Sequence, residues 1–241
     1  MNSPDQRIIV TGGATNIGRA ITETFLKRGA RVVIGQPEPA VARPLIERYG
    51  ERVAALPVDV GDPEQCRNFV DAAVAKLGGL DVLVNNAAIT GPAVVGSLEG
   101  VRAADFDRLV RVNLGGAVFC SQAAAPHLRA AGGGVIIHIS SVNAIRPQRG
   151  AMLYAATKAG VSSLAQSMGA ELAADGIRVV AVAPGDIRTP ESEQMAGGAP
   201  GSAPLGSGEP GDVGEVVAFL CSPQAKYVTA TTWLVDGGWI G

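Results

Sequence analysis

Residues 7–18, RIIVTGGATNIG, join a short β-rich run to a helical pattern through a glycine-rich turn. Residues 8–10 are branched and apolar, which is typical of a buried strand. After the turn, Ile17, Ile21 and Phe25 recur at the spacing of one helix face. The stretch therefore predicts a strand, a tight turn and a helix in direct succession.

Short apolar runs of this kind recur along the chain and alternate with longer segments. Further strands are predicted over residues 31–34, 53–56, 81–84, 134–139, 177–182 and 232–235. Capping and stop signals predict helices over residues 62–78, 151–175 and 212–221. Seven strands with helix-length connections indicate an α/β fold, with a seven-stranded, mostly parallel sheet and helices on both faces.

The composition fits one such domain over residues 1–241. Hydrophobic residues make up 47% and charged residues 17%, which excludes a largely disordered chain. With 20 basic and 22 acidic residues and no basic run, we expect no nucleic-acid partner. We also expect no membrane partner, because no apolar stretch is long enough to span a bilayer.

The polar N-terminus and the cysteines bear on location. The N-terminal residues do not resemble a signal peptide. The three cysteines, Cys66, Cys120 and Cys221, are scattered, which suits a reducing compartment and small buried side chains. Their spacing is not that of a metal site, so we expect a cytoplasmic protein without a metal ion.

The glycine-rich turn is a candidate anion site. Glycines let the backbone approach a pyrophosphate, and a helix N-terminus offers unpaired N–H groups and the positive end of a dipole. Taken alone, such a turn could also be only a tight connection. Its position between the first strand and a helix favours the binding interpretation.

A segment near the C-terminus breaks the β/α alternation. Residues 186–211 are dense in Gly, Pro, Ser and Ala. Only 30 residues follow, too few for a second domain. We expect a flexible substrate loop within the single domain, because long loops in compact domains are often functional.

Tyr154 and Lys158 form the strongest catalytic candidate. Four residues apart on a helix, they share one face. A nearby ammonium lowers the pKa of a phenol, which suits a base working near neutral pH. The pair could equally be two exposed side chains on an amphipathic helix, but Ser141 precedes it at the end of a predicted strand and favours a site.

A serine hydrolase is disfavoured. Ser141 would then need a histidine base held by an acid. His138 lies in an apolar run and His127 follows Pro126 on a predicted helix, so we expect a core and a near-surface histidine.

Several motifs occur in an order that resembles the short-chain dehydrogenase/reductase family. The chain is identified as a member of its ordinary-length branch, with a Rossmann-type doubly wound fold. Two departures from the family pattern are Asn16 and Ala88, which replace glycines; Asn tolerates positive φ, so the turn can survive. The motifs cover almost the whole chain: TGGATNIG (11–18), NNAA (85–88), VNLG (112–115), SS (140–141), YAATK (154–158), PGDIRT (184–189) and VDGG (235–238).

The resemblance implies four catalytic residues. Tyr154 would exchange a proton with the substrate oxygen. Lys158 would lower the Tyr154 pKa and bind the nicotinamide ribose, and Ser141, favoured over Ser140, would hydrogen-bond the substrate oxygen. Asn113 would hold a water that feeds protons toward Lys158.

The resemblance also implies a dinucleotide cofactor and its contacts. By alignment, Gln36 stands at the tip of the second strand, where an acid selects NAD and a base selects NADP. Gln36 is neutral and no Lys or Arg stands at Thr15 or Pro37, so NAD is preferred weakly and NADP stays open. The implied contacts are Gly12, Thr15, Asn16, Ile17, Gly18, Gln36, Asp59, Val60, Asn86, Ala87, Ala88, Tyr154, Lys158, Pro184, Gly185, Ile187 and Thr189.

The substrate is expected to be a small ketone, secondary alcohol or polyol. Ser141, Tyr154, Asn143 and Gln148 are the predicted contacts, and Ile89, Thr90, Ile145 and Met152 are further candidates for the wall of its site. Relatives commonly form homotetramers through the helices near residues 114–130 and 151–175 and through the last strand, and the same is expected here. A catalytically silent dinucleotide-binding regulator, and a dehydratase or epimerase using the same tyrosine, are the alternatives.

Overall fold

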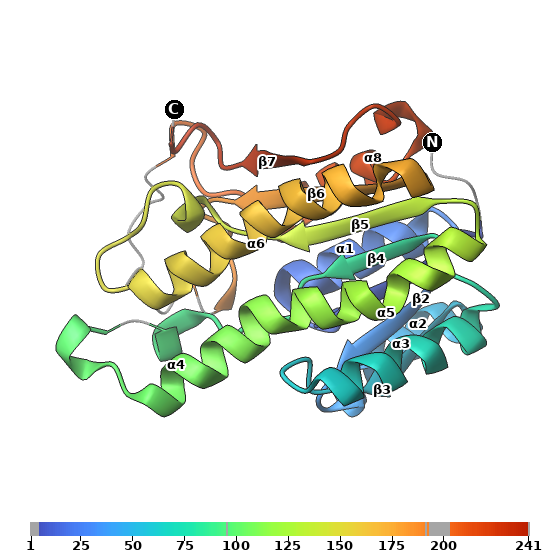
Figure 1. Ribbon diagram of the computed structural model, residues 1–241, viewed down its shortest axis with the longest axis horizontal. Helices are drawn as coiled ribbons and strands as arrows, with labels where there is room; N and C mark the ends of the chain where they lie inside the picture. The colour runs from blue at the N-terminus through green and yellow to red at the C-terminus, as the bar shows by residue number, and fades with distance from the viewer. Residues whose placement is uncertain (1–4, 95, 191, 193–202, 241) are drawn as a thin grey trace.

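The computed structural model describes residues 5–94, 96–190, 192 and 203–240. Seven strands form a single sheet in the order β3-β2-β1-β4-β5-β6-β7, and every neighbouring pair is parallel (Figure 1). The predicted doubly wound sheet is confirmed. The strands are β1 (Arg7–Thr11), β2 (Arg31–Gln36), β3 (Val53–Pro57), β4 (Val82–Asn85), β5 (Gly134–Ile139), β6 (Ile177–Pro184) and β7 (Thr231–Val235).

Helices cover both faces of the sheet. Figure 1 shows α3, α5 and α6 on one face, with α1 and α8 behind the sheet. Strand residues alternate between the two layers: Ile8 and Val10 pack with the α1 and α8 side, and Ile9 packs with the α3 and α5 side. The helices are α1 (Asn16–Lys27), α2 (Arg43–Tyr49), α3 (Pro63–Leu77), α4 (Ala103–Val110), α5 (Gly116–Ala130), α6 (Met152–Leu172) and α8 (Pro210–Leu220).

The sequence signals at the helix ends are where the structure needs them. The Asp62 side chain caps α3 by accepting hydrogen bonds from the Glu64 and Gln65 amides. Gly78 ends the same helix in the left-handed conformation. The helix predicted over 151–175 is α6 followed by a 3-10 turn, and it stops at Gly176 with φ of 71°.

The strand order places a crevice at the centre of the sheet. The chain leaves β1 to build β2 and β3 on one side, and later returns to place β4 on the other. Thr11 and Asn85, the last residues of β1 and β4, are paired in register. In open α/β sheets, ligands bind at the carboxyl ends of the strands where the order reverses.

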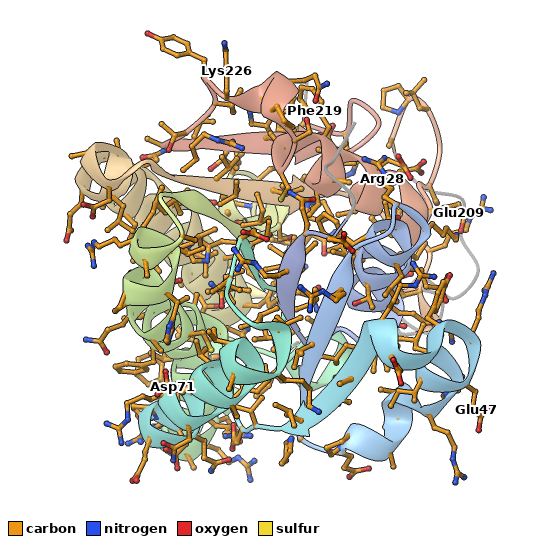
Figure 2. The ribbon with its side chains drawn as sticks, turned by 90° about the vertical axis from the view of Figure 1, so that its right-hand side faces the viewer. Arg28, Glu47, Asp71, Glu209, Phe219 and Lys226 are labelled. Atoms are coloured by element: carbon orange, nitrogen blue, oxygen red, sulfur yellow. The ribbon has the colours of Figure 1, made fainter. Side chains whose placement is uncertain are left out.

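Charged side chains lie on the surface, with one exception. Glu47 and Lys226 point outward at the periphery in Figure 2, and Asp71 is also exposed. Among the residues that the structure describes, Lys158 is the one Lys, Arg, Asp or Glu that is buried, with 3% of its surface exposed. Burying a charge is costly unless it is paired or used, so Lys158 marks a functional region.

Candidate active site

A cavity of about 710 Å³ opens at the carboxyl ends of the strands. Its lining includes Gly12 after β1, Asn86 after β4, Ser141 after β5 and Gly185 after β6. The glycine turn and the Tyr154–Lys158 pair therefore share one cavity, although more than 130 residues separate them. Apart from Asn113 and the wall candidates Ile145 and Met152, all predicted site residues line it.

The glycine turn is shaped for close backbone approach. Gly12 has φ of 64°, which favours glycine, and a Cβ on Gly18 would lie 2.2 Å from the Gly12 carbonyl oxygen. The Asn86 side chain donates hydrogen bonds to the Thr11 and Gly12 carbonyl oxygens, at 3.0 and 3.1 Å, and so ties the turn to the end of β4. Asn16 has φ of 48°, so it adopts the left-handed conformation that its amide tolerates.

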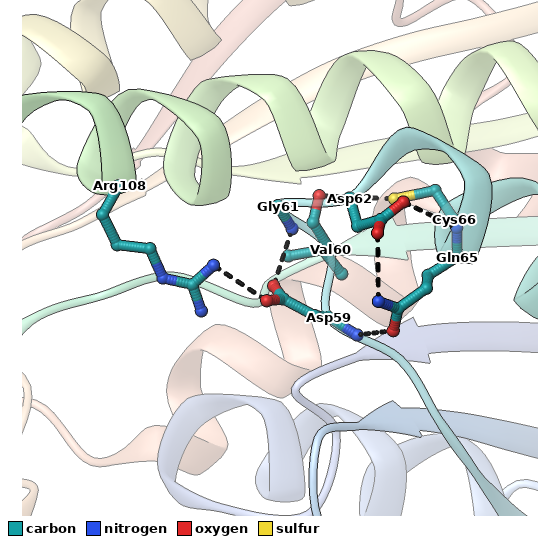
Figure 3. Close-up of polar contacts among 7 residues, drawn as sticks. All are labelled: Asp59, Val60, Gly61, Asp62, Gln65, Cys66 and Arg108. Carbon is teal, nitrogen blue, oxygen red and sulfur yellow. Dashed lines mark hydrogen bonds and ion pairs between the residues drawn. The ribbon is translucent and has the colours of Figure 1, made fainter. Parts of the chain in front are cut away.

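One end of the cavity carries an acid held by a cation. Figure 3 shows Arg108 reaching from α4 to the Asp59 carboxylate, at 2.8 Å, while Asp59 also accepts a hydrogen bond from the Gly61 amide. Desolvation opposes ionisation of Asp59, but these hydrogen bonds outweigh it and lower the Asp59 pKa. The acid stays charged beside Val60, at the place expected to contact an adenine ring. The sequence analysis missed Arg108 because 49 residues separate it from Asp59.

The side chain of Gln36 fits a ribose. Its Oε1 atom is buried and has no hydrogen-bond partner within the described part of the chain. An unpartnered buried acceptor is costly, and a hydroxyl donor from a ligand in the cavity would satisfy it. Together with the glycine cradle, this acceptor matches a dinucleotide.

Ser141, Tyr154 and Lys158 converge in the same cavity. Ser141 follows β5, and Tyr154 and Lys158 lie one turn apart on α6. The Lys158 ammonium donates a hydrogen bond to the Ile139 carbonyl oxygen at 2.8 Å and lies 5.6 Å from the centre of the Tyr154 ring. The spacing in the sequence therefore produces one cluster with a hydroxyl, a phenol and a buried cation.

The electrostatics of this cluster differ in one respect from the expectation. Burial raises the pKa of Tyr154, while a hydrogen bond with Ser141 lowers it, and burial dominates. Burial also lowers the pKa of Lys158 to about 8. The expected fall in the Tyr154 pKa is thus not present in this structure, because desolvation outweighs the hydrogen bond with Ser141.

The two adjacent serines have different surroundings. The Ser140 hydroxyl donates to the Lys158 carbonyl oxygen at 2.9 Å and contacts the Ser162 hydroxyl at 2.7 Å, so it fastens β5 to α6. The Ser141 hydroxyl accepts a hydrogen bond from the backbone N–H of Asn143 at 3.2 Å. It also forms a hydrogen bond with the Tyr154 side chain. This arrangement fits the choice of Ser141 over Ser140 for contact with a substrate oxygen.

Asn113 lies behind the cavity instead of in its wall. It is buried in a π-helical turn between α4 and α5, at residues Arg111–Gly115. Its amide oxygen accepts from the Ile89 N–H at 2.7 Å, and its amide nitrogen donates to the Ile89 carbonyl at 3.1 Å. Since both ends of the amide are bonded to Ile89, the role of Asn113 in proton transfer stays a prediction.

The substrate side combines polar and aromatic groups. Asn143 and Gln148 line the cavity. The side-chain oxygen of Asn143 accepts a hydrogen bond from the backbone N–H of Gln148 at 2.8 Å. Ile145 and Met152 do not line it, so these two wall predictions are wrong; Ile145 points outward and is 56% exposed. Trp239 does line the cavity, and the sequence analysis did not single it out.

The PGDIRT segment, which is predicted to contact the nicotinamide, lies in the cavity wall. Pro184, Gly185, Ile187 and Thr189 all line the cavity. The ends of the predicted loop are fastened: residues 187 and 208 form a parallel bridge, and Asp186 accepts a hydrogen bond from the Ser207 hydroxyl at 2.8 Å. Within that loop, residues 191 and 193–202 lie outside the described residues.

The two histidines lie where the sequence analysis expects them. His127 is partly exposed, and its ring contacts Asp71 at 2.8 Å. His138 is fully buried on β5, and burial, with repulsion from Lys158, lowers its pKa to about 3. No group of three or more His, Cys, Asp or Glu side chains within the described ranges could hold a metal ion.

His138 should make the fold sensitive to acid. Its pKa is about 3 in the folded protein, against 6.5 as the ordinary value, so the unfolded chain binds the proton more readily between these limits. As the pH falls through this range, the free energy of unfolding should drop by up to about 1.4 kcal/mol per pH unit. Urea unfolding at several pH values should show a shallower loss for His138→Asn. His127→Asn is the matched control, and equal pH dependence in the wild type and His138→Asn would contradict this prediction.

Comparison with known proteins agrees with this geometry. A family model described as Enoyl-(Acyl carrier protein) reductase matches residues 12–240. The chain is 36% identical to 3-oxoacyl-(acyl-carrier-protein) reductase FabG of Thermotoga maritima, over 95% of this chain and 96% of that protein. The chain belongs to the short-chain dehydrogenase/reductase family. It is accordingly an NAD(P)-dependent oxidoreductase, as the sequence motifs predict.

Two further relatives are similar to this dehydrogenase/reductase, one in sequence and one in sequence and fold. It is 37% identical to cis-4-hydroxycyclohexanecarboxylate dehydrogenase of Sinomonas cyclohexanicum, over 96% of this chain and 95% of that protein. Its fold superposes with a TM-score of 0.90 on 3-ketoacyl-(acyl-carrier-protein) reductase from Brucella melitensis complexed with NADH, at 33% identity and 98% coverage of both chains. None of the helices in the described ranges is long and apolar enough to cross a membrane.

Proposed function

We propose that this dehydrogenase/reductase interconverts a small secondary alcohol and its ketone, with Tyr154 as the acid/base. The observation that carries the proposal is the meeting of Ser141, Tyr154 and buried Lys158 in the cavity that also holds the glycine turn. Hydroxyl, phenol and ammonium are the groups that proton transfer at a carbonyl oxygen needs.

Each side chain has a role that its surroundings support. Ser141 donates a hydrogen bond to the substrate oxygen, and its bond to Tyr154 directs the phenol toward the same point. Tyr154 gives its proton to the carbonyl oxygen in reduction and takes it back in oxidation. Lys158, charged near neutral pH and fixed by Ile139, favours the phenolate when the proton leaves. A bound nicotinamide supplies or accepts the hydride.

The dinucleotide is NAD in preference to NADP. The cavity contacts that would hold it are the glycine turn, Gln36, Asp59 and Lys158. Gln36 offers a buried neutral acceptor to a ribose hydroxyl and no positive charge to a 2′-phosphate.

Charge at position 36 should change the cofactor preference. Gln36→Asp places a carboxylate against the 2′-phosphate of NADP. Like charges at close range cost about 1.4 kcal/mol or more. The ratio of kcat/KM for NAD to kcat/KM for NADP should therefore rise by about tenfold or more. Gln36→Arg should move the ratio the other way. Glu38→Gln is the control on the following exposed segment. Equal ratios in all four proteins would show that position 36 does not contact the ribose.

A labelled substrate separates this proposal from its rivals. Deuterium at the carbinol carbon of a turned-over alcohol should appear in the reduced cofactor, one atom per product. A dehydratase or epimerase would give product without net change in cofactor redox state. A silent regulator would bind the dinucleotide without any transfer. Finding product with no deuterium in the cofactor pool would contradict simple hydride exchange.

Two parts of the proposal concern the protein in the cell. The assembly is a homotetramer that packs through α5 and α6, whose small side chains permit close approach. The protein works in the cytoplasm, where its three free, buried cysteines stay reduced.

A further inference from the structure

The C-terminal turn delivers an aromatic side chain to the cavity. Trp239 lines the same cavity as Ser141 and Tyr154, although it lies beyond the last strand. Figure 1 shows the C-terminus at the same end of the molecule as the segment between β5 and α6. Trp239 thus belongs to the wall of the cavity that also holds the residues used in the proton chemistry.

The turn that carries Trp239 is held at several points. The Asp236 carboxylate accepts hydrogen bonds from the Gly238 and Ile240 amides, at 3.0 and 3.1 Å, and the Trp239 amide donates to the Asp236 carbonyl at 3.1 Å. Gly237 and Gly238 have φ of 60° and 85°, which a tight turn of this kind requires. The indole therefore approaches the cavity from a fixed backbone.

Arg146 fixes the indole from outside. Its guanidinium lies 5.6 Å from the centre of the Trp239 ring and donates a hydrogen bond to the Trp239 carbonyl at 3.2 Å. Arg146 is exposed and does not line the cavity, so it contacts Trp239 without being part of the cavity wall. It lies five residues after Ser141, and so couples the Trp239 wall to the catalytic segment.

We infer that Trp239 is the specificity-determining wall of the substrate site, and that it selects a substrate whose alcohol or ketone belongs to a saturated six-membered ring. This inference rests on the proposed function and narrows its substrate class. The face of an indole can contact one whole side of a rigid ring at once, whereas a flexible chain loses more conformational entropy to reach the same contact. Asn143 and Gln148 supply polar groups for ring substituents. An alicyclic ring and a sugar pyranose share this chemistry.

The test compares ring and chain substrates in matched variants. Turnover is measured with cyclohexanol derivatives, pyranose sugars, and acyclic alcohols and polyols. Trp239→Ala should raise KM for ring substrates at least tenfold relative to acyclic ones, with a smaller change in kcat, and Trp239→Phe should recover most of the loss. The control is Trp233→Phe, which changes the other tryptophan of the chain. Trp233 lies on β7 and packs against Phe219 of α8. Arg146→Ala should raise the same KM values, and Arg146→Lys should restore them if Arg146 is a positioning residue.

A binding measurement keeps the inference separate from catalysis. In Trp233→Phe, Trp239 is the sole tryptophan, and its emission should change when a ring compound enters the cavity, but not with an acyclic polyol. Equal changes in KM for ring and chain substrates in Trp239→Ala would overturn the inference. If the wild type turns over no substrate, the proposed function fails, and the Trp239 emission then tests the wall by itself. An emission change limited to ring compounds would support the Trp239 wall. The absence of such a change would overturn it.

Discussion

Replacing Tyr154 with phenylalanine should lower kcat by about a thousandfold while leaving dinucleotide affinity within about twofold, because general acid–base catalysis typically contributes about 10²–10⁴. The variant loses only the hydroxyl. The ring keeps its place on α6 and its contact with the Lys158 ammonium. Turnover and dinucleotide binding are measured on the same preparation, by cofactor absorbance and by calorimetry.

A second tyrosine provides the control for this variant. Tyr227 is 99% exposed and lies outside the cavity, so Tyr227→Phe should leave both quantities unchanged. If Tyr154→Phe kept near-normal turnover, the acid/base assignment would be wrong. If it lost dinucleotide binding as well, the loss of activity would report damage to the site and not loss of a proton donor.

Gly18→Ala should abolish measurable dinucleotide binding, with a loss of about a hundredfold or more. A Cβ at this position would lie 2.2 Å from the Gly12 carbonyl oxygen and 2.4 Å from the Asn86 side-chain nitrogen. The Gly12 oxygen belongs to the turn itself, and the Asn86 nitrogen ties the turn to the end of β4, so the backbone must move where the pyrophosphate is expected to approach. Titration with NAD and NADP measures the loss, and thermal unfolding measures the accompanying change in stability.

Gly211 is a suitable control for Gly18. It also lies in a helix, near the start of α8, but a Cβ there would meet nothing within 4 Å. Gly211→Ala should bind both dinucleotides normally and be slightly more stable, because Ala favours a helix by about 1 kcal/mol over Gly. Wild-type affinity in Gly18→Ala would contradict the assignment of the turn as the phosphate site.

Most of the fold could be predicted because its signals are local. Seven apolar runs bounded by turn residues correspond to the seven strands, since a strand buried on both faces must be apolar throughout. The ends of α3 could also be predicted, because the signals that set them, Asp62 and Gly78, are local to the helix. The strand order was not predicted, because hydrophobic periodicity does not say which strands are neighbours.

The site could be predicted only where its residues form short motifs. Tyr154 and Lys158 are neighbours on one helix face, so their spacing carries the signal. Arg108 and Trp239 were missed because each meets the cavity through a contact between distant segments: Arg108 with Asp59, and Trp239 with Arg146. The environment of Asn113 could not be predicted from the sequence either. Its hydrogen bonds to Ile89 depend on how a π-helical turn packs against the segment that follows β4.

The most direct test of the central claim is turnover with NAD and NADP in parallel, against secondary alcohols, sugars and polyols. Formation of reduced nicotinamide is followed for the wild type and Tyr154→Phe. We expect the wild type to reduce the cofactor with at least one alcohol, faster with NAD than with NADP, and Tyr154→Phe to lose this activity. Binding of dinucleotide without turnover of any compound, or equal turnover by both proteins, would contradict it.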